Sequence, residues 1–211
     1  MPSRFFVTGS DTNVGKTVVS AMLCAALDAV YWKPIQTGSR EGTDRMTVMR
    51  LAELPKSRTV REKYLFTPPV SPHLAARLAG VRIDLRKIVA PKLAAEENLI
   101  AEGAGGVLVP VNRRQLMTDV MKRVRLPVVL VTRTALGTIN HTLLSVAALR
   151  AARIDLRCVV MVGKPNKENQ KAIEHYGAVA VAGTLPHLRR LDRRTLVRAF
   201  DTHFEKALFR E

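Results

Sequence analysis

The residues best placed to do chemistry lie in the segment GSDTNVGKT, residues 9–17. Glycine, lysine and threonine in succession, after an apolar run and before a helical pattern, are typical of a loop that binds nucleotide phosphates. The backbone N–H groups of such a loop hold the phosphates, Lys16 reaches the β- and γ-phosphates, and the hydroxyl of Thr17 can bind Mg²⁺. The usual spacing puts the first glycine at position 10, where this chain has Ser10, so the loop is one residue longer between its glycines. The segment predicts phosphoryl transfer, and the alternative is a strand followed by a chance Gly-Lys-Thr.

Three other charged residues are expected near this loop. Glu102 stands at the end of an apolar run and before a glycine cluster, where packing gives no reason for a carboxylate. Asp44 begins a helical pattern over residues 44–53, so it caps that helix, binds a metal ion, or does both. Together with Thr17, the two carboxylates form a set of oxygen ligands that suits an octahedral Mg²⁺. Lys33 precedes a proline at the end of a short apolar run, and it either is a solvated surface lysine or projects into the same site as Lys16.

These residues need strands and helices that bring their segments together. Continuous apolar runs predict strands that are buried on both faces, at residues 4–8, 30–35, 98–102, 127–132, 156–162 and 178–182. Helical patterns lie between them or follow them, most clearly at residues 16–29, 138–150 and 193–208. Strands that alternate with helices predict an α/β fold, a three-layer sandwich with a mostly parallel sheet like that of P-loop NTPases, in one domain over residues 1–211. Ligands of such sheets bind beyond the carboxyl ends of the strands, so we expect the candidate residues along one rim.

The composition narrows the class of partner. Of the 211 residues, 47% are hydrophobic and 25% are charged, which is an ordinary globular balance. The net charge is +16, but the basic residues are scattered and only 5% of residues are aromatic, so we do not expect nucleic acid as the main partner. Anionic metabolites are also attracted by a dispersed basic surface. We see neither a signal peptide nor an apolar stretch long enough to span a membrane, so we expect a cytoplasmic protein without a membrane partner. Cys24 and Cys158 stand in apolar runs, which predicts buried free thiols.

Five segments match one enzyme family in the same order along the chain. They are VTGSDTNVGKT (7–17), WKPIQTGS (32–39), TPPVSPHLAA (67–76), AEGAGGVLVPV (101–111) and RLPVVLVTRTALGTINHTLLS (125–145). These segments resemble motifs of the dethiobiotin synthetases, and the GAGG and LGTINH blocks are specific to that family. The phosphate-binding loop alone is not.

This resemblance implies an ATP- and Mg²⁺-dependent ligase. In the family's reaction, 7,8-diaminononanoate takes up CO₂ as a carbamate, and the γ-phosphoryl group of ATP activates the carbamate as a carbamic–phosphoric anhydride. The neighbouring amine then closes the ureido ring of dethiobiotin. Lys33 and Lys16 are the implied catalytic residues, with Lys33 at the carbamate, and Thr37 stands where the family has a serine that contacts the carbamate. Thr17, Asp44 and Glu102 are the implied ligands of the metal ion.

The resemblance also implies where the nucleotide and the far end of the substrate bind. Gly137, Ile139 and Asn140 lie at an expected helix start, whose N–H groups would bind the substrate carboxylate in a site completed by the partner in a homodimer. His73 and His141 are given no chemical role. The nucleotide site comprises Asn13, Val14, Gly15, Lys16, Thr17, Val18, Asp44, Glu102, Gly103, Ala104, Gly105, Val162, Gly163, Pro186, His187 and Leu188.

The chain departs from the family pattern where the base is read. The family commonly has an asparagine after the strand that matches residues 156–162, and this chain has Val162 and Gly163 there. Arg190 stands where a glutamate often follows the family's later G-x-[IL]-P-x-L segment. A site without these groups discriminates less among bases, so we expect CTP or GTP to be accepted as well as ATP.

Three other functions fit the phosphate-binding loop alone. Another P-loop amidoligase usually carries a glutamine amidotransferase domain, for which 211 residues leave no room. A nucleotide-dependent switch ATPase needs no second substrate, and it would leave Lys33, Thr37 and the LGTINH block unexplained. A basic ATPase that acts on nucleic acid would bind DNA in a salt-sensitive way.

Overall fold

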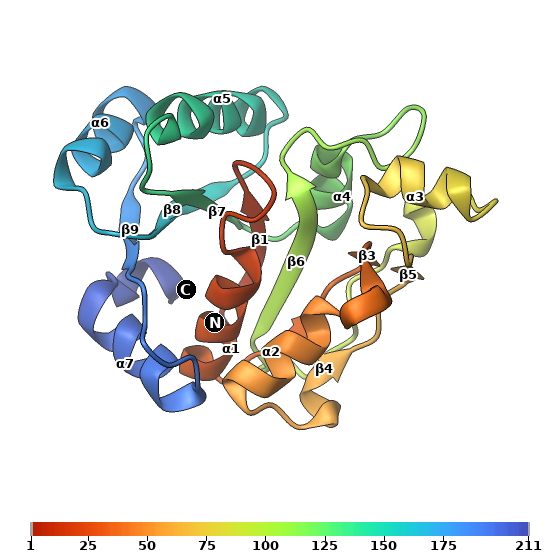
Figure 1. The fold of residues 1–211 in the computed structure, drawn as a ribbon, viewed down its shortest axis with the longest axis horizontal. Coiled ribbons are helices and arrows are strands. Elements are labelled where there is room, and N and C mark those ends of the chain that lie inside the picture. The colour runs from red at the N-terminus through yellow and green to blue at the C-terminus, as the bar shows by residue number, and fades with distance from the viewer. Residues whose placement is uncertain (1, 211) are drawn as a thin grey trace.

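The computed structural model describes residues 2–210, and a parallel sheet runs through its centre (Figure 1). The strand order is β4-β2-β6-β1-β7-β8-β9, and every neighbouring pair is parallel. The strands are β1 (Arg4–Gly9), β2 (Val30–Trp32), β4 (Thr59–Val60), β6 (Leu99–Gly106), β7 (Val128–Arg133), β8 (Leu156–Val162) and β9 (Val181–Leu185). A second, two-stranded sheet pairs β3 (Ile35–Gln36) with β5 (Tyr64–Leu65).

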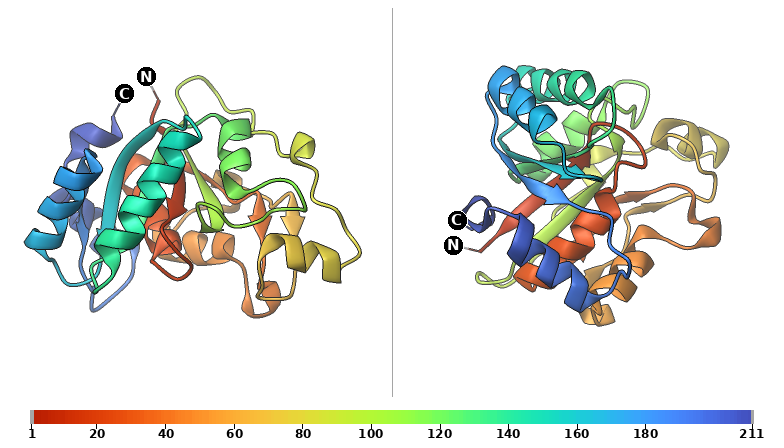
Figure 2. Two further views of the ribbon diagram at one scale, coloured as in Figure 1. Left: turned by 90° about the horizontal axis from the view of Figure 1, so that it is seen from above. Right: turned by 60° about the vertical axis from the view of Figure 1, so that its left-hand side comes forward.

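Helices cover both faces of the large sheet, which confirms the expected three-layer α/β sandwich (Figure 2). One layer holds α1 (Lys16–Leu27), α2 (Asp44–Ala52) and α7 (Arg193–His203); the other holds α3 (Pro72–Leu78), α4 (Met117–Val124), α5 (Thr138–Ala151) and α6 (Lys167–Gly177). Successive residues of β1 point to opposite faces, so Phe5 packs in the core under α1 while Phe6 packs in the core on the other side. Within residues 2–210, no helix combines the length and the apolar character needed to cross a bilayer.

Short 3₁₀ helices complete the connections between these elements. They are η1 (Ser39–Glu41), η2 (Lys56–Arg58), η3 (Leu85–Lys87) and η4 (Lys206–Phe209).

Three strands differ from the sequence-based expectation. The strand expected at residues 30–35 is broken, because Pro34 has no N–H to continue the ladder, and its carbonyl instead accepts hydrogen bonds from Lys63 and Tyr64. The strand expected at residues 98–102 continues through the glycine cluster to Gly106, which pairs with Gly9 of β1. The last strand is β9, Val181–Leu185, and not residues 178–182, because Ala178 is the left-handed C-cap of α6.

Two helices are shorter than predicted. The first helix ends at Leu27, since Asp28 adopts a left-handed conformation (φ 48°) that ends the helix. The helix expected over residues 193–208 ends at His203. Phe204 is extended and forms an antiparallel bridge to Gly183 of β9 before η4 begins.

The carboxyl ends of the parallel strands lie along one rim, as predicted. β1, β2, β6 and β7 end at Gly9, Trp32, Gly106 and Arg133. The segments after β1 and β2 and the second half of β6 carry the residues singled out above, so the parallel topology brings them together.

Candidate functional site

The phosphate-binding loop connects β1 to α1. Gly15 is the N-cap of α1 in a left-handed conformation (φ 98°), and a Cβ there would lie 3.0 Å from the side chain of Val162, so only glycine fits without strain. No side chain caps α1, which leaves its first N–H groups available to an anion. The Nζ of Lys16 folds back over the loop and donates to the carbonyl of Asp11 at 2.8 Å. The loop therefore has the form that its sequence predicts.

Lys16 is the buried cation of this loop. Burial is the main cause that lowers its pKa to about 8, and the nearby positive charge of Lys33 lowers it further. Glu102 and Asp44 act in the opposite direction. A phosphate group bound in the loop would favour the charged form of Lys16 and so raise its pKa again.

A largely buried ion-pair cluster lies beside the loop, just after the end of β2 and in the middle of β6. The Nζ of Lys33 donates to Glu102 Oε1 at 2.9 Å, to Asp44 Oδ2, and to the carbonyl of Gly103 at 3.3 Å. Lys33 is 4% exposed and Glu102 is 0% exposed. Burial opposes the charge on Lys33, but the Glu102 and Asp44 carboxylates outweigh it and raise the pKa of Lys33 above its usual value. Lys33 therefore stays protonated and acts as a fixed cation rather than a base.

Glu102 joins this cluster to the phosphate-binding loop. Thr17 donates from its hydroxyl to Glu102 Oε1 at 3.0 Å, and Tyr31 donates from its phenol to Glu102 Oε2 at 3.1 Å. The structure thus brings together the three predicted metal ligands, Thr17, Asp44 and Glu102. One hydroxyl and two carboxylates are the oxygen donors that Mg²⁺ prefers, so the residues fit that ion.

A cavity of about 690 Å³ lies over the loop and the cluster. Its walls include Thr37 and the segment from Pro69 to Pro72, before and at the start of α3. A volume of this size suits a small-molecule site. The predicted residues that line it are Asn13, Gly15, Lys16, Thr17, Val18, Lys33, Thr37, Asp44, Glu102, Ala104 and Gly105.

The other predicted residues do not line this cavity. Val14 is buried in the core, and Gly103 lies under the cavity, where its carbonyl accepts from Lys33. Val162 contacts Gly15 from behind the loop, and the N–H of Gly163 donates to the carbonyl of Leu185. Pro186, His187 and Leu188 follow the end of β9. Gly137, Ile139 and Asn140 lie at the start of α5, whose neighbours Leu136, Thr138 and His141 line a separate cavity with Ser10 and Asp11.

The capping role of Asp44 differs from the prediction. The N-cap of α2 is Thr43, which accepts a hydrogen bond from the N–H of Met46, so Asp44 is the first residue inside the helix and does not cap it. Its carboxylate instead faces Lys33. Ser71 occupies the N-cap position of α3 but makes no capping bond there, and its hydroxyl lies 3.0 Å from Nδ1 of His73.

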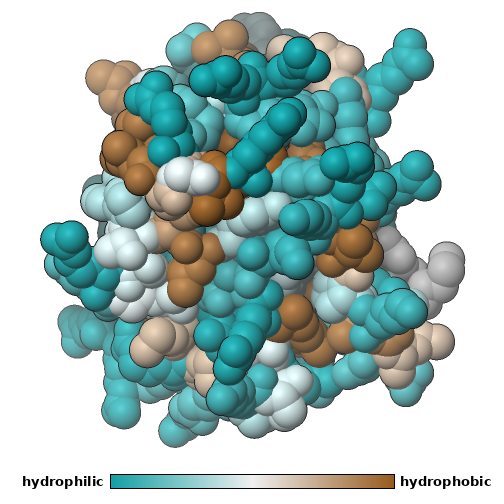
Figure 3. Space-filling model, turned by 90° about the vertical axis from the view of Figure 1, so that its right-hand side faces the viewer, coloured by the Kyte–Doolittle hydropathy of each residue, from teal (hydrophilic) through white to brown (hydrophobic). Residues whose placement is uncertain are grey.

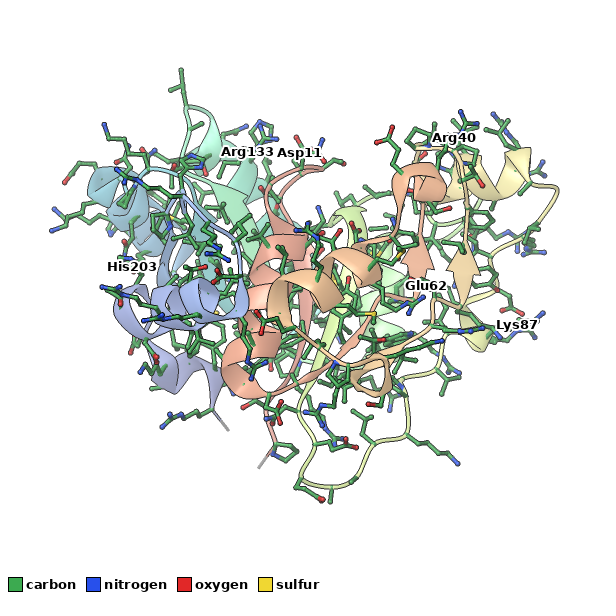
Figure 4. The ribbon with its side chains drawn as sticks, turned by 60° about the horizontal axis from the view of Figure 1, so that its bottom comes forward. Asp11, Arg40, Glu62, Lys87, Arg133 and His203 are labelled. Carbon is green, nitrogen blue, oxygen red and sulfur yellow. The ribbon has the colours of Figure 1, made fainter. Side chains whose placement is uncertain are left out.

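Sequence reasoning missed three residues of the site. Tyr31 looks like a core residue within an apolar run. Its role appears only from its pairing with Ile100 on β6, which brings its phenol within reach of Glu102. Gln36 accepts from the N–H of Asp44 and donates to the carbonyl of Thr37, so it joins two walls of the cavity. Arg133 donates to the carbonyl of Asn13 at 3.0 Å. Figure 4 shows it beside Asp11, at the ends of β7 and β1. The polar type of Gln36, three residues after Lys33, was the one available signal.

Comparisons with known proteins agree with this geometry. A family model described as an AAA domain matches residues 3–195. Relatives named ATP-dependent dethiobiotin synthetase BioD are 48% identical in Rhodopseudomonas palustris (strain BisB5), over 99% of this chain and 98% of theirs, and 46% identical in Agrobacterium fabrum (strain C58), over 100% and 99%. A solved ParA family ATPase from Chlorobium tepidum has a TM-score of 0.52 at 11% identity, covering 95% of this chain and 93% of its own. The MinC:MinD cell division protein complex of Aquifex aeolicus also gives 0.52, at 14% identity, covering 93% of this chain and 86% of its own, and both likenesses show the fold alone.

Proposed function

The chain belongs to the dethiobiotin synthetase family, and from that membership we infer that it is an ATP-dependent dethiobiotin synthase. Such an enzyme is a cyclo-ligase. It carboxylates one amine of 7,8-diaminononanoate with CO₂, transfers the γ-phosphoryl group of ATP to the carbamate, and expels phosphate when the second amine attacks. The observation that supports this best is that one cavity holds both a phosphate-binding loop and a wall formed by Lys33 and Thr37. A switch ATPase has no second substrate, so it would not need the wall formed by Lys33 and Thr37.

Lys16 and Lys33 are the catalytic residues of this proposal. Phosphoryl transfer depends on positioning and on neutralising charge. Lys16, held over the loop, would neutralise the transferred phosphoryl group. Lys33, which stays protonated between two carboxylates, would hold the negative carbamate. Thr37 would donate its hydroxyl to the same carbamate from the adjoining wall.

Thr17, Asp44 and Glu102 would hold Mg²⁺ as cofactor. When bound, this ion would neutralise phosphate charge. Thr17 already contacts Glu102 at 3.0 Å, so the two ligands are in place. Asp44 is tied to Glu102 through Lys33, which keeps the second carboxylate beside the loop.

The proposal includes a homodimer that completes the substrate site. The start of α5, with Gly137, Ile139 and Asn140, lies outside the main cavity, so it would bind the substrate carboxylate of a partner subunit. An exposed apolar surface supports this arrangement. Leu136 is fully exposed, Leu144 on α5 is 62% exposed and Leu108 is 56% exposed. Leu108 and Leu144 line one further cavity between the segment after β6 and α5. Apolar side chains gathered in this way are typical of protein interfaces.

The proposal also includes a weak preference for the nucleotide base. Val162 and Gly163 offer no side-chain donor or acceptor, and the N–H of Gly163 is engaged with Leu185. CTP and GTP would therefore be accepted beside ATP.

Phosphate release tests the proposed reaction directly. The purified protein is given Mg²⁺, bicarbonate and ATP, with and without 7,8-diaminononanoate, and phosphate and dethiobiotin are measured. We expect release that depends on the diamine, with Lys33→Met lowering kcat by about 10²-fold because a positioned charge is lost. The exposed Lys164→Met is the matched control and should leave the rate unchanged. Release that ignores the diamine would instead indicate a switch ATPase.

A further inference from the structure

A second large cavity shares α3 with the reaction cavity. It measures about 630 Å³, and α3, the segment 80–83 and the segment 111–114 form its walls. The reaction cavity contacts Ser71 and Pro72, whereas this one contacts residues 73, 76 and 77. Figure 3 views the side of the molecule that carries α3, and hydrophilic side chains there project around hydrophobic patches. None of the residues assigned above to ATP, to the metal ion or to the diamine lines this cavity.

Four arginines line this cavity, and no acidic residue does. They are Arg77, Arg82, Arg113 and Arg114, and each is exposed. Among residues 2–210, no aspartate or glutamate forms an ion pair with any of the four. The acidic residues nearby are already engaged, because Asp84 pairs with Arg86 at 2.9 Å and Asp119 accepts from the N–H of Leu116. Four like charges around one hollow create a positive potential that attracts an anion.

The cavity also has an apolar part. Val81 at its edge is 45% exposed, whereas Ala76, Ile83 and Val111 line it but are themselves buried, at 4%, 0% and 0% exposure. Val81 is therefore the apolar side chain that a ligand can cover, and a phosphate ion alone would leave it in water. An exposed apolar side chain beside charged groups suits a molecule with an anionic head and an apolar or aromatic body.

The walls are fixed to one another before any ligand arrives. The side-chain amide of Asn112 donates to the carbonyl of Ile83 at 3.0 Å and to Oε1 of Gln115 at 2.8 Å, which ties the two loops together. The N–H of His73 donates to the carbonyl of Pro110 at 3.2 Å, which ties α3 to the second loop. A cavity whose walls are already joined needs little reordering when it binds a ligand.

We propose that this cavity binds a small organic phosphate, with its phosphate among Arg77, Arg82, Arg113 and Arg114 and its apolar body against Val81. Guanidinium groups match phosphate oxygens with two parallel hydrogen bonds, and four of them around one site favour a doubly charged phosphate over a single carboxylate. The volume is that of a site for a small molecule rather than a flat surface for an acidic protein. The proposal does not depend on the reaction that the enzyme catalyses.

Direct binding of 1-naphthyl phosphate tests this site. The wild-type protein is first saturated with Mg²⁺ and a non-hydrolysable ATP analogue, so that the phosphate-binding loop is occupied, and the dissociation constant of the probe is then measured by its fluorescence. We expect the double substitution R77Q/R113Q to weaken binding about tenfold, since two charge-assisted contacts are lost. The control is R194Q/R198Q, which removes the same charge from exposed positions on α7 and should leave the affinity unchanged. Uncharged 1-naphthol should bind at least about tenfold more weakly than the phosphate.

Several results would overturn the proposal. Equal affinity of the wild type and R77Q/R113Q would place the probe elsewhere. Equal affinity for 1-naphthol and its phosphate would leave an apolar hollow without a phosphate site. Displacement of the probe by a hexa-aspartate peptide, at concentrations where inorganic phosphate has no effect, would replace the small molecule with an acidic protein partner.

Discussion

The two ends of the proposed nucleotide site differ in the kind of residue that forms them. At the phosphate end, charged side chains are buried and each one has a partner: Lys16 contacts the carbonyl of Asp11, and Lys33 contacts Asp44 and Glu102. At the base end, Val162, Gly163 and Pro186 offer apolar side chains and backbone. The amide of Asn169 is near β8, but it donates to the carbonyl of Thr134.

This difference determines how strongly a substitution at each end should affect nucleotide binding. A buried charge is costly unless it is paired, so each residue of the phosphate end is held by its neighbours and a single substitution disturbs several contacts. An apolar base end has no such network, and a substitution there changes little beyond local packing. We therefore expect large effects at the phosphate end and small ones at the base end.

The largest effect is expected from Glu102→Gln. The amide oxygen of glutamine can accept from Thr17 or from Tyr31, but not from both, because the two hydroxyls donate to different oxygens of Glu102. The substitution also removes the negative charge that pairs with buried Lys33. We expect the free energy of unfolding to fall by about 2–4 kcal/mol, because one partner of a buried ion pair is lost. The rate of phosphate release should fall about 10²-fold. Urea denaturation and the diamine-dependent assay measure the two changes.

Glu168→Gln is the control for this substitution. Glu168 pairs with Lys171 on the surface of α6 at 3.0 Å, with its side chain 82% exposed. Removing such a pair should change stability by less than about 0.5 kcal/mol. Equal losses in the two variants would contradict the view that the buried cluster stabilises the phosphate end.

An intermediate effect is expected from pH. The pKa of Lys16 is about 8 in the free protein, and bound phosphates favour its charged form. Below pH 8 the lysine is already protonated, so affinity for an ATP analogue should vary little. Above pH 8 binding must first return the proton, and affinity should fall by up to about tenfold per pH unit.

Titration calorimetry between about pH 7 and about pH 9.5 measures this dependence. Net proton uptake on binding should appear at pH values above 8 as a dependence of the binding enthalpy on the buffer. Lys16→Met should bind the ATP analogue more weakly, and its binding enthalpy should not depend on the buffer. A buffer dependence of the binding enthalpy that persists in this variant would assign the proton to another group.

The smallest effect is expected at the base end. Dissociation constants for ATP, GTP and CTP should lie within about tenfold of one another, since Val162 and Gly163 provide no side-chain amide that would discriminate among the bases. Val162→Asn adds an amide at the end of β8 and should favour ATP by about threefold to tenfold. Val89→Asn, at a position that is 62% exposed and outside the site, should change none of the three constants. A strict requirement for ATP in the wild type would contradict this account.

The sequence predicted the parts of the fold that depend on local pattern. The parallel sheet, the phosphate-binding loop and the rim that collects Lys33, Thr37 and Glu102 all follow from apolar runs and spacing. The glycine cluster was misjudged as the end of a strand. Gly103 instead continues β6, because a Cβ there would lie 2.9 Å from the ring of Phe6 and only glycine allows this close packing.

Residues whose roles depend on register could not be predicted. Tyr31 has the same apolar neighbours as a core tyrosine, and its bond to Glu102 arises because β2 lies beside β6. Gln36 and Asp44 are eight positions apart, and their contact arises only after Pro34 has directed the chain out of the large sheet. Neither contact leaves a pattern in the sequence.

Because of the cluster around Lys33, the charged side chains of the site neutralise one another before any ligand binds. Lys16, Lys33, Asp44 and Glu102 carry two positive and two negative charges within one buried group, so their sum is zero. A triphosphate that binds alone would add negative charge to this neutral group. A triphosphate that binds with its metal ion would bring negative charge for the lysines and positive charge for the carboxylates. In the proposed binding mode Asp44 and Glu102 would then hold the metal ion, and the ammonium of Lys33 would be available to hold the carbamate. In this scheme nucleotide, metal ion and carbamate each replace an internal ion pair, and the three ligands are bound together more readily than any of them alone.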